Sequence, residues 1–398
     1  MNITIITCFL PWPLYSGGAQ AQFNIINHIR HQHNITLIFQ TNRQNTNSAM
    51  HYLQQLWPEV NIIKYPIWRQ LLSLSFFKDK AGRAIRKTFT PNSRAFQVQK
   101  ILKPYGFCIS KDFSRYINKI IKTQKTDLLQ VEFYPCLDMI EYLPNHIKKI
   151  FVHHELRYIR NERMTKSLLL TQKEENFLFN LKQHELSMLN KYDAIITLTE
   201  QDRNFLIRDG IYTPIHVSPA AVNSTPMTYV DWNGSLSFVG GYAHIPNKEG
   251  IDWFLKEVVS TKEDFPHLNI IGTGWPESYN TQNSTTKGFV ESLPEAIHDT
   301  IMIVPLLTGS GMRMKILDAA ALSIPFVTTS VGVEGLKFKP GESCMVANNA
   351  REFADAIMLL KENSALRKRI GENANIVFNS FYSAKHLAEV RNKIYETL

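Results

Sequence analysis

The chain alternates short apolar runs with amphipathic stretches, and this alternation occurs twice along its length. In the first half, strand-type apolar runs lie at 2–9, 33–40, 61–66, 128–133, 148–154, 194–199 and 215–220. Helical patterns separate them, as at 19–31 and 175–191. Alternation of this kind with short connections predicts a doubly wound parallel sheet.

The second half restarts the alternation after a polar stretch at 223–234, which we interpret as a linker. Strands are expected at 236–241, 268–274, 301–306, 325–330 and 344–347. Apolar spacing predicts helices at 246–260 and 312–322, and three more from Arg351 onward. The length of 398 residues also favours two cores over one. We therefore expect two α/β domains that face each other across a cleft at the carboxyl ends of their strands.

The domain boundaries follow from this pattern. We place a first domain at 1–225, with a helical insertion at about 70–125, and a second domain at 226–378. Residues 379–398 are expected to form a C-terminal helix that packs back on the first domain.

The net charge of +9 is concentrated in one segment. From Lys64 to Lys125, fifteen Lys and Arg face two Asp, a local charge of +13, so the rest of the chain carries −4. An apolar cluster borders these cations at 71–89, a composition that suits a helix on an anionic membrane surface. The alternative is a helix whose charged face is solvated and whose apolar side chains pack in the core. The charge has no nucleic-acid-binding signature, so no nucleic-acid partner is expected.

The start of the chain and its cysteines exclude other classes. No basic region precedes Pro11, and no apolar run is long enough for a membrane span. The sequence therefore predicts a cytoplasmic protein, either free or peripheral on the inner face of the cell membrane. Cys8, Cys108, Cys136 and Cys344 have no metal-ligand spacing, so neither a zinc site nor a disulfide framework is expected.

The stretch LLTGSGMRMKILDAA at 306–320 places two glycines and two cations at the mouth of a predicted helix. Backbone amides and the helix dipole favour an anion there, and Arg313 and Lys315 are unfavourable in the first turns unless an anion compensates them. Asp318 can accept hydrogen bonds from hydroxyls beside that anion. The pattern predicts a ligand with phosphate and sugar. A glycine turn with a surface Lys315–Asp318 pair and no ligand is the alternative.

With these motifs the chain resembles the retaining, nucleotide-sugar-dependent glycosyltransferases of the GT-B fold that have a group 1 type C-terminal domain. The similar segments are 237–255, 270–276, 288–294 and 304–336 in the second half, and 11–20, 153–157 and 196–206 in the first. The resemblance implies an α/β fold of two Rossmann-like domains. It also implies sugar transfer from a UDP- or GDP-sugar to a glycan or lipid-linked acceptor, as in bacterial cell-envelope polysaccharide or glycoconjugate assembly.

The resemblance also implies roles for particular residues. The donor would be bound by Gly17, Gly18, Gly240, Gly241, Phe289, Val290, Ser310, Gly311, Met312 and Asp318. Lys315 and Arg313 would neutralise the β-phosphate as the sugar leaves. Asp318 would accept from the ribose hydroxyls, and the backbone around Phe289 and Val290 would contact the edge of the base.

A histidine is expected at the reacting sugar. His154 would exchange a hydrogen bond with a sugar hydroxyl, and His153 is its rival, since the two are adjacent. A core or surface histidine is the alternative for either one. Glu155 could serve the acceptor hydroxyl, although a solvated helix cap is favoured.

Three positions depart from the family pattern. The family usually has two glutamates eight positions apart, where this chain has Ser310 and Asp318, so the identity of the donor sugar stays open. It also often has an arginine where this chain has Gly241, and Arg313 would supply that cation. The resemblance implies retention by front-face attack, in which a donor phosphate oxygen takes the acceptor proton. The sequence has no convincing Asp-x-Asp site, so we expect neither a metal nor a cofactor apart from the donor.

A dinucleotide-dependent oxidoreductase is disfavoured because the loop at 11–18 is not GxGxxG and no acidic residue closes the second strand. An epimerase or phosphorylase of the same fold, and a non-catalytic nucleotide-binding partner, remain as alternatives.

Overall fold

The computed structural model describes residues 1–14, 16–40, 46–65, 111–166, 168–222, 228–309 and 312–398. Ser310, Gly311 and most of the basic stretch 71–125 lie outside these residues, so the expectations for them stay predictions. The chain has two compact units. Unit 1 comprises Met1–Pro13, Ile26–Ser218 and Asn392–Leu398, and unit 2 comprises Leu14–Ile25 and Pro219–Arg391.

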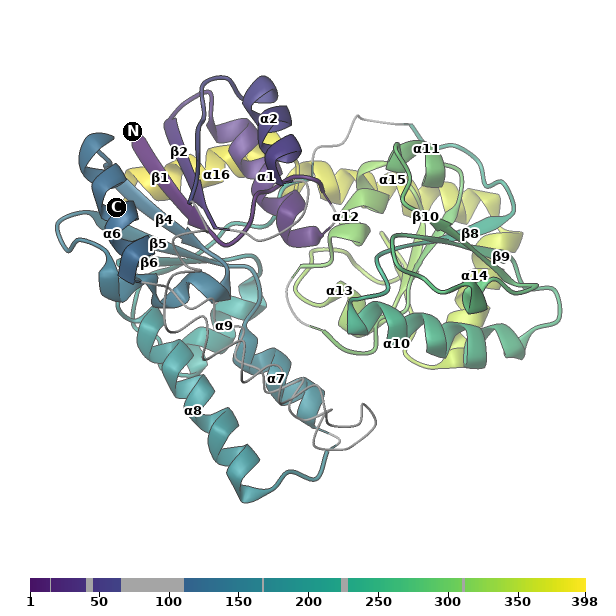
Figure 1. Ribbon diagram of the computed structural model, residues 1–398. Helices are drawn as coiled ribbons and strands as arrows, with labels where there is room; N and C mark the ends of the chain where they lie inside the picture. Colours follow the sequence, from purple (N-terminus) through teal and green to yellow (C-terminus); the bar gives the residue numbers. More distant parts are fainter. Residues whose placement is uncertain (15, 41–45, 66–110, 167, 223–227, 310–311) are drawn as a thin grey trace. The chain divides into compact units, whose positions relative to one another are not determined.

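Unit 1 is built on a parallel sheet of seven strands in the order β3-β2-β1-β4-β5-β6-β7 (Figure 1). The strands are β1 (Asn2–Thr7), β2 (Asn34–Phe39), β3 (Asn61–Lys64), β4 (Leu128–Glu132), β5 (Lys148–His153), β6 (Ala194–Thr197) and β7 (Ile215–Val217). Each one coincides with an apolar run predicted as a strand. All residues of β4 and all but the first of β1, β2 and β5 are buried, as expected where helices cover both faces of a parallel sheet.

The helices of the first half are α1 (Gly17–Ile29), α2 (Thr46–Leu56), α6 (Lys111–Thr123), α7 (Arg157–Thr165), α8 (Gln172–Leu189), α9 (Glu200–Arg208) and the 3-10 segment η1 (Tyr134–Tyr142). A reciprocal pair of hydrogen bonds between Thr171 and Glu174 starts α8, which lies alongside α7 (Figure 1). The end of the chain also belongs to this core, because Tyr395 is buried and its hydroxyl donates to Gln130 Oε1 at 2.6 Å.

Unit 2 is built on a parallel sheet of six strands in the order β10-β9-β8-β11-β12-β13. The strands are β8 (Ser235–Val239), β9 (His267–Ile271), β10 (Ser284–Gly288), β11 (Ile301–Val304), β12 (Phe326–Thr328) and β13 (Met345–Val346). The helical segments are α10 (Ile245–Trp253), η2 (Phe254–Val258), η3 (Val259–Thr261), η4 (Glu277–Tyr279), α11 (Leu293–Ile297), α12 (Met314–Ala321), α13 (Ser330–Val333), α14 (Ala350–Glu362), α15 (Ser364–Phe381) and α16 (Ala384–Glu396). The two Rossmann-like sheets confirm the predicted α/β fold class.

Three local features differ from the sequence prediction. Strand β10 was missed, because its residues Ser-Thr-Thr-Lys-Gly are polar and it lies at the edge of the sheet. The helix predicted at 312–322 begins at Met314, because Arg313 has the non-helical dihedrals φ −90° and ψ 84°. The helix predicted at 246–260 is α-helical only to Trp253 and then continues as a π and a 3-10 turn.

Each sheet has one place where the strand order reverses. In unit 1 this place lies between β1 and β4, and in unit 2 it lies between β8 and β11. Open parallel sheets bind ligands beside the carboxyl ends of the strands at such points. Nowhere in the described part of the chain is a helix long and apolar enough to cross a bilayer.

Candidate functional site

Four of the predicted donor-binding residues that the structure describes follow β8 and β11, the two strands at the reversal point of unit 2. Gly240 and Gly241 come directly after β8. The loop after β11 leads into α12, which carries Lys315 and Asp318. The structure therefore brings the glycine turn and the cationic helix end to the same edge of the sheet.

The turn at Gly240 leaves no room for a side chain. Its φ is 153°, and a Cβ at this position would lie 2.4 Å from Asn247 Nδ2 and 3.0 Å from Lys315 Nζ. The carbonyl oxygen of Gly240 accepts a hydrogen bond from Trp275 Nε1 at 2.8 Å. Gly272 follows β9, and a Cβ there would lie 2.4 Å from that same oxygen. Glycine at both positions thus allows the turns after β8 and β9 to pack together.

The side chain of Lys315 is enclosed by this turn. Its Nζ donates to Asn247 Oδ1 at 2.8 Å and lies 4.0 Å from the centroid of the Phe238 ring, a cation–π contact. Burial lowers the pKa of the ammonium to about 7, an effect that Asp318 opposes and Arg313 reinforces. An anion at this point would restore the charged form.

Asp318 lies one turn further along α12 and is also buried. Burial raises its pKa to about 7, against the lowering effects of a hydrogen bond from Gln20 and the charge of Lys315. Gln20 Nε2 donates to Asp318 Oδ1 at 2.9 Å. The carboxylate is therefore placed to accept from a polar donor, a position that Gln20 fills in this structure.

The amino ends of α1 and α12 meet beside these residues. Gly17 is the first residue of α1, and a Cβ there would lie 3.0 Å from Cγ of Met314, the first residue of α12. Gly18 follows in the same turn. Two helix amino ends at one place add their partial positive charges, which favours an anion.

Arg313 caps the amino end of α12 and is only 6% exposed. Its Nη2 lies 3.7 Å from Glu334 Oε2, at the end of α13. Neither Arg313 nor Lys315 points into bulk water, so the arrangement does not fit a pair of solvated surface cations. Glu334, which the sequence did not single out, balances part of this charge.

Met312 and two more of the predicted donor residues that the structure describes occupy the same edge of unit 2. Met312 precedes α12, and its sulfur accepts a hydrogen bond from the Ala220 amide at 3.1 Å. Phe289 and Val290 follow β10, next to the carbonyl of Gly288, which accepts from the Gly272 amide at 2.8 Å. Phe289 is 62% exposed and Val290 is half-buried. The backbone at 289–290 thus lies beside the glycine turns.

In unit 1, the two adjacent histidines have different environments. His153 ends β5 with a fully buried side chain, and its Nε2 lies 2.8 Å from Glu185 Oε1. The same carboxylate accepts from the backbone amides of Arg157 and Tyr158, each at 3.0 Å, and so caps the start of α7. His153 therefore serves the packing of β5, α7 and α8.

His154 keeps access to solvent, with 11% of its side chain exposed. Its Nε2 lies 2.9 Å from Glu132 Oε2, and its ring stacks on Phe133 with centroids 3.9 Å apart. Glu132 is buried and also accepts from Gln130 Nε2 at 2.6 Å. Phe133 has a φ of 68°, a strained value typical of functional sites. The sequence did not predict this carboxylate–histidine pair, although Glu132 ends a buried strand next to β1.

Two further expectations concern charged groups. Glu155 lies 2.9 Å from Arg160 Nη1 and 3.7 Å from Arg157 Nη1, so it forms ion pairs with α7. Among the described residues, no three His, Cys, Asp or Glu side chains come together in a way that could hold a metal ion.

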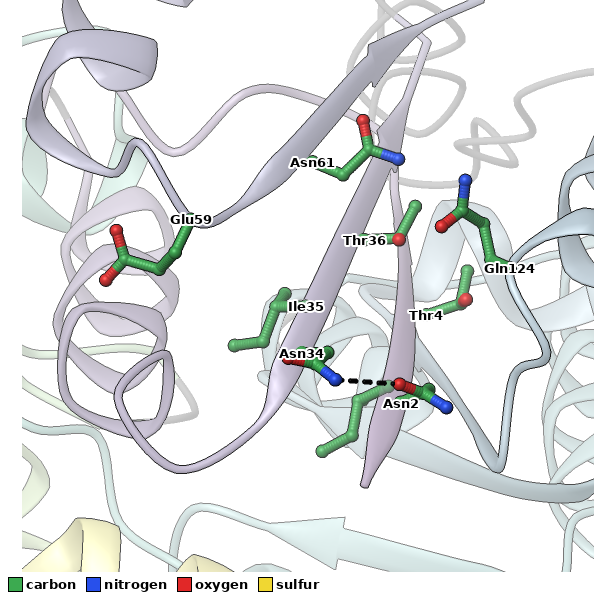
Figure 2. A pocket seen from close by; sticks show the side chains of 9 residues that line it. Asn2, Thr4, Asn34, Ile35, Thr36, Glu59, Asn61 and Gln124 are labelled. Carbon is green, nitrogen blue, oxygen red and sulfur yellow. Dashed lines mark hydrogen bonds between the residues drawn. The ribbon is translucent and has the colours of Figure 1, made fainter.

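A polar hollow of about 150 Å³ lies at the opposite, amino-terminal edge of the unit 1 sheet (Figure 2). Asn2 and Asn34 line it, and Asn34 Nδ2 donates to Asn2 Oδ1 at 3.0 Å. Thr4 also lines it, with its hydroxyl 2.7 Å from that of Thr126. Because parallel sheets bind ligands at their carboxyl edge, we do not assign the active site to this hollow.

The chain is similar to known proteins both in sequence and in structure. Residues 233–363 match the family described as glycosyl transferases group 1. An uncharacterised 44.6 kDa protein in the cps region of Klebsiella pneumoniae is 24% identical over 96% of this chain and 97% of its own length. Among solved structures, sucrose-phosphate synthase from Thermosynechococcus elongatus superposes with a TM-score of 0.71 at 12% identity, covering 100% of this chain and 99% of that chain. Anabaena HepE in complex with UDP and glucose gives a TM-score of 0.67 at 10% identity, covering all of both chains.

The solved structures share the fold, and the matched region contains the glycine turn, α10 and α12. The resemblance to group 1 glycosyltransferases of the GT-B fold is thereby confirmed, whereas retention stays a prediction. Residues 233–363 are thus similar to the group 1 glycosyl transferases, and the two Rossmann-like units have the GT-B fold.

Proposed function

We propose that the protein transfers a sugar from a nucleoside diphosphate sugar to a glycan or lipid-linked acceptor. The observation that carries this proposal is the enclosed ammonium of Lys315, which lies at the reversal point of unit 2 with a neutral amide as its hydrogen-bond partner. A buried cation of this kind calls for an anion. The donor's diphosphate meets that need.

The chemistry needs charge stabilisation on the leaving group. As the bond between the sugar and the phosphate breaks, negative charge grows on the β-phosphate. Lys315 and Arg313 would stabilise it, because fixed charges in a dry site act without reorganisation. Asp318 would exchange its hydrogen bond with Gln20 for one with a ribose hydroxyl.

Two comparisons support the choice of substrates. The solved HepE complex contains UDP and glucose, which fits a UDP-sugar donor, and a GDP-sugar is the other candidate. The Klebsiella relative lies in a cps region, which supports a role in cell-envelope polysaccharide assembly.

The first prediction concerns Lys315. A matching UDP- or GDP-sugar should raise the melting temperature of the wild type, because a ligand bound only to the folded state stabilises it. Lys315→Ala should lower kcat by roughly 100- to 1000-fold, the usual loss when one stabilising donor of this kind is removed. Lys339→Ala, at an exposed lysine of the same unit, is the control and should leave turnover unchanged. Turnover of Lys315→Ala close to that of the wild type would contradict the proposal.

The second prediction is retention of the anomeric configuration. Both oxygens of Glu132 accept hydrogen bonds, one from Gln130 and the other from His154, so this carboxylate is poorly placed as a nucleophile. Front-face attack then relies on a donor phosphate oxygen to take the acceptor proton, while His154 contacts a sugar hydroxyl. Proton NMR of the product from an α-linked donor should show an α-glycoside. A β-glycoside would overturn the mechanism.

The third prediction is turnover without a divalent ion. In this proposal Lys315 and Arg313 supply the positive charge that a metal supplies to the diphosphate in other enzymes. Activity in excess chelator should therefore equal activity in its absence. Loss of activity in chelator that a divalent ion restores would show that the two side chains do not suffice.

The fourth prediction follows from the pKa of Lys315, which burial lowers to about 7 in the free protein. The diphosphate stabilises the charged form and raises this pKa, so binding above pH 7 should take up a proton and weaken as pH rises. Measurement between about pH 7.5 and 9 keeps Asp318, whose pKa is about 7, largely ionised. Calorimetry in buffers of different ionisation enthalpy measures the uptake. Lys315→Arg stays charged and should bind without uptake. Equal uptake in that variant would assign the proton to another group.

A further inference from the structure

Asn247 connects the glycine turn to the lysine. It lies in the first turn of α10, is 6% exposed, and has both ends of its side-chain amide engaged. Its Nδ2 donates to the carbonyl oxygen of Gly241 at 3.0 Å, and its Oδ1 accepts from Lys315 Nζ at 2.8 Å. A single side chain thus joins the turn after β8 to α12.

The chemistry of these partners fixes the orientation of the amide. A backbone carbonyl only accepts hydrogen bonds and an ammonium only donates them. The nitrogen of Asn247 must therefore face Gly241 and its oxygen must face Lys315. A flipped amide would lose both hydrogen bonds and place donor against donor.

The backbone around Asn247 leaves space for its side-chain amide. A Cβ at Gly240 would lie 2.9 Å from Asn247 Cγ as well as 2.4 Å from Nδ2, so a side chain there would displace the amide. The backbone amide of Asn247 itself donates to the carbonyl of His244 at 2.9 Å. The main chain of α10 and the turn at Gly240, which has no side chain, therefore fix the position of the Asn247 amide. The amide in turn fixes the position of the Lys315 ammonium.

We propose that Asn247 is a positioning residue, whose amide holds the Lys315 ammonium and the Gly240–Gly241 turn as one preformed surface for the donor's diphosphate. This inference rests on the proposed function. Without the amide, the ammonium would lose its neutral hydrogen-bond acceptor beside the turn. Asn247 itself touches no reacting atom.

The first test measures the titration of Lys315 in the free protein. The ¹³Cε resonance of Lys315 is assigned by its loss in Lys315→Arg and followed with pH. Asn247→Ala removes the acceptor of the ammonium and should lower the midpoint, whereas Asn247→Asp places a carboxylate there and should raise it. If Asn247 only supported the fold, these two substitutions would not shift the titration midpoint of Lys315 in opposite directions.

Asn375 provides a matched control in the same unit. Its Nδ2 donates to the carbonyl oxygens of Ala320 at 3.1 Å and Ala321 at 2.7 Å, at the other end of α12. Asn375→Ala therefore removes a comparable amide tie to the same helix. It should lower stability without moving the Lys315 midpoint.

The second test measures binding of uridine diphosphate and guanosine diphosphate by calorimetry at pH 8. Asn247→Ala should weaken whichever nucleotide the wild type binds by about tenfold or more, the scale of a lost hydrogen bond to a charged group. Asn375→Ala should bind as the wild type does. The inference is overturned if Asn247→Ala matches Asn375→Ala in midpoint and in affinity. A wild type that binds neither nucleotide refutes the proposed function, and the midpoints still decide the role of Asn247.

Discussion

The Lys315 ammonium, held between the Asn247 amide and the Phe238 ring, determines how the rest of this site is arranged. Removing a charge from water is costly, and here a neutral amide and an aromatic ring replace the lost hydration only in part. The backbone around it is arranged accordingly, since Gly240 has no side chain and the amino ends of α1 and α12 face the same place. A diphosphate would complete this arrangement, because it places negative charge beside an ammonium whose hydrogen-bond partner is a neutral amide.

The reversal points of the two sheets carry different chemistry. Unit 2 presents fixed positive charge and helix ends, which suit a phosphate-bearing leaving group. Unit 1 presents His154 on a buried carboxylate, Glu132, whose oxygens are both engaged. The first arrangement stabilises charge and the second orients a ring that can contact a sugar hydroxyl.

Much of the fold can be predicted from the sequence, because strands buried on both faces appear as apolar runs. Strand β10 could not be predicted in this way, since it is a polar strand at the edge of its sheet. The role of Arg313 and Lys315 at an anion site could be predicted, because cations are unfavourable at the start of a helix. Their partners could not, because Asn247 lies 68 residues from Lys315 and Gln20 lies 298 residues from Asp318. Contacts of that range depend on the topology that brings β8, β11 and α1 together, and single-sequence patterns do not encode them.

A crystal structure of the protein with uridine diphosphate or guanosine diphosphate bound would test the role of Lys315 most directly. Phosphate oxygens should lie within hydrogen-bonding distance of Lys315 Nζ, beside the turn at Gly240 and the amino end of α12, with a ribose hydroxyl on Asp318 in place of Gln20. A nucleotide bound elsewhere, with Lys315 and Gln20 still in their present contacts, would contradict this role.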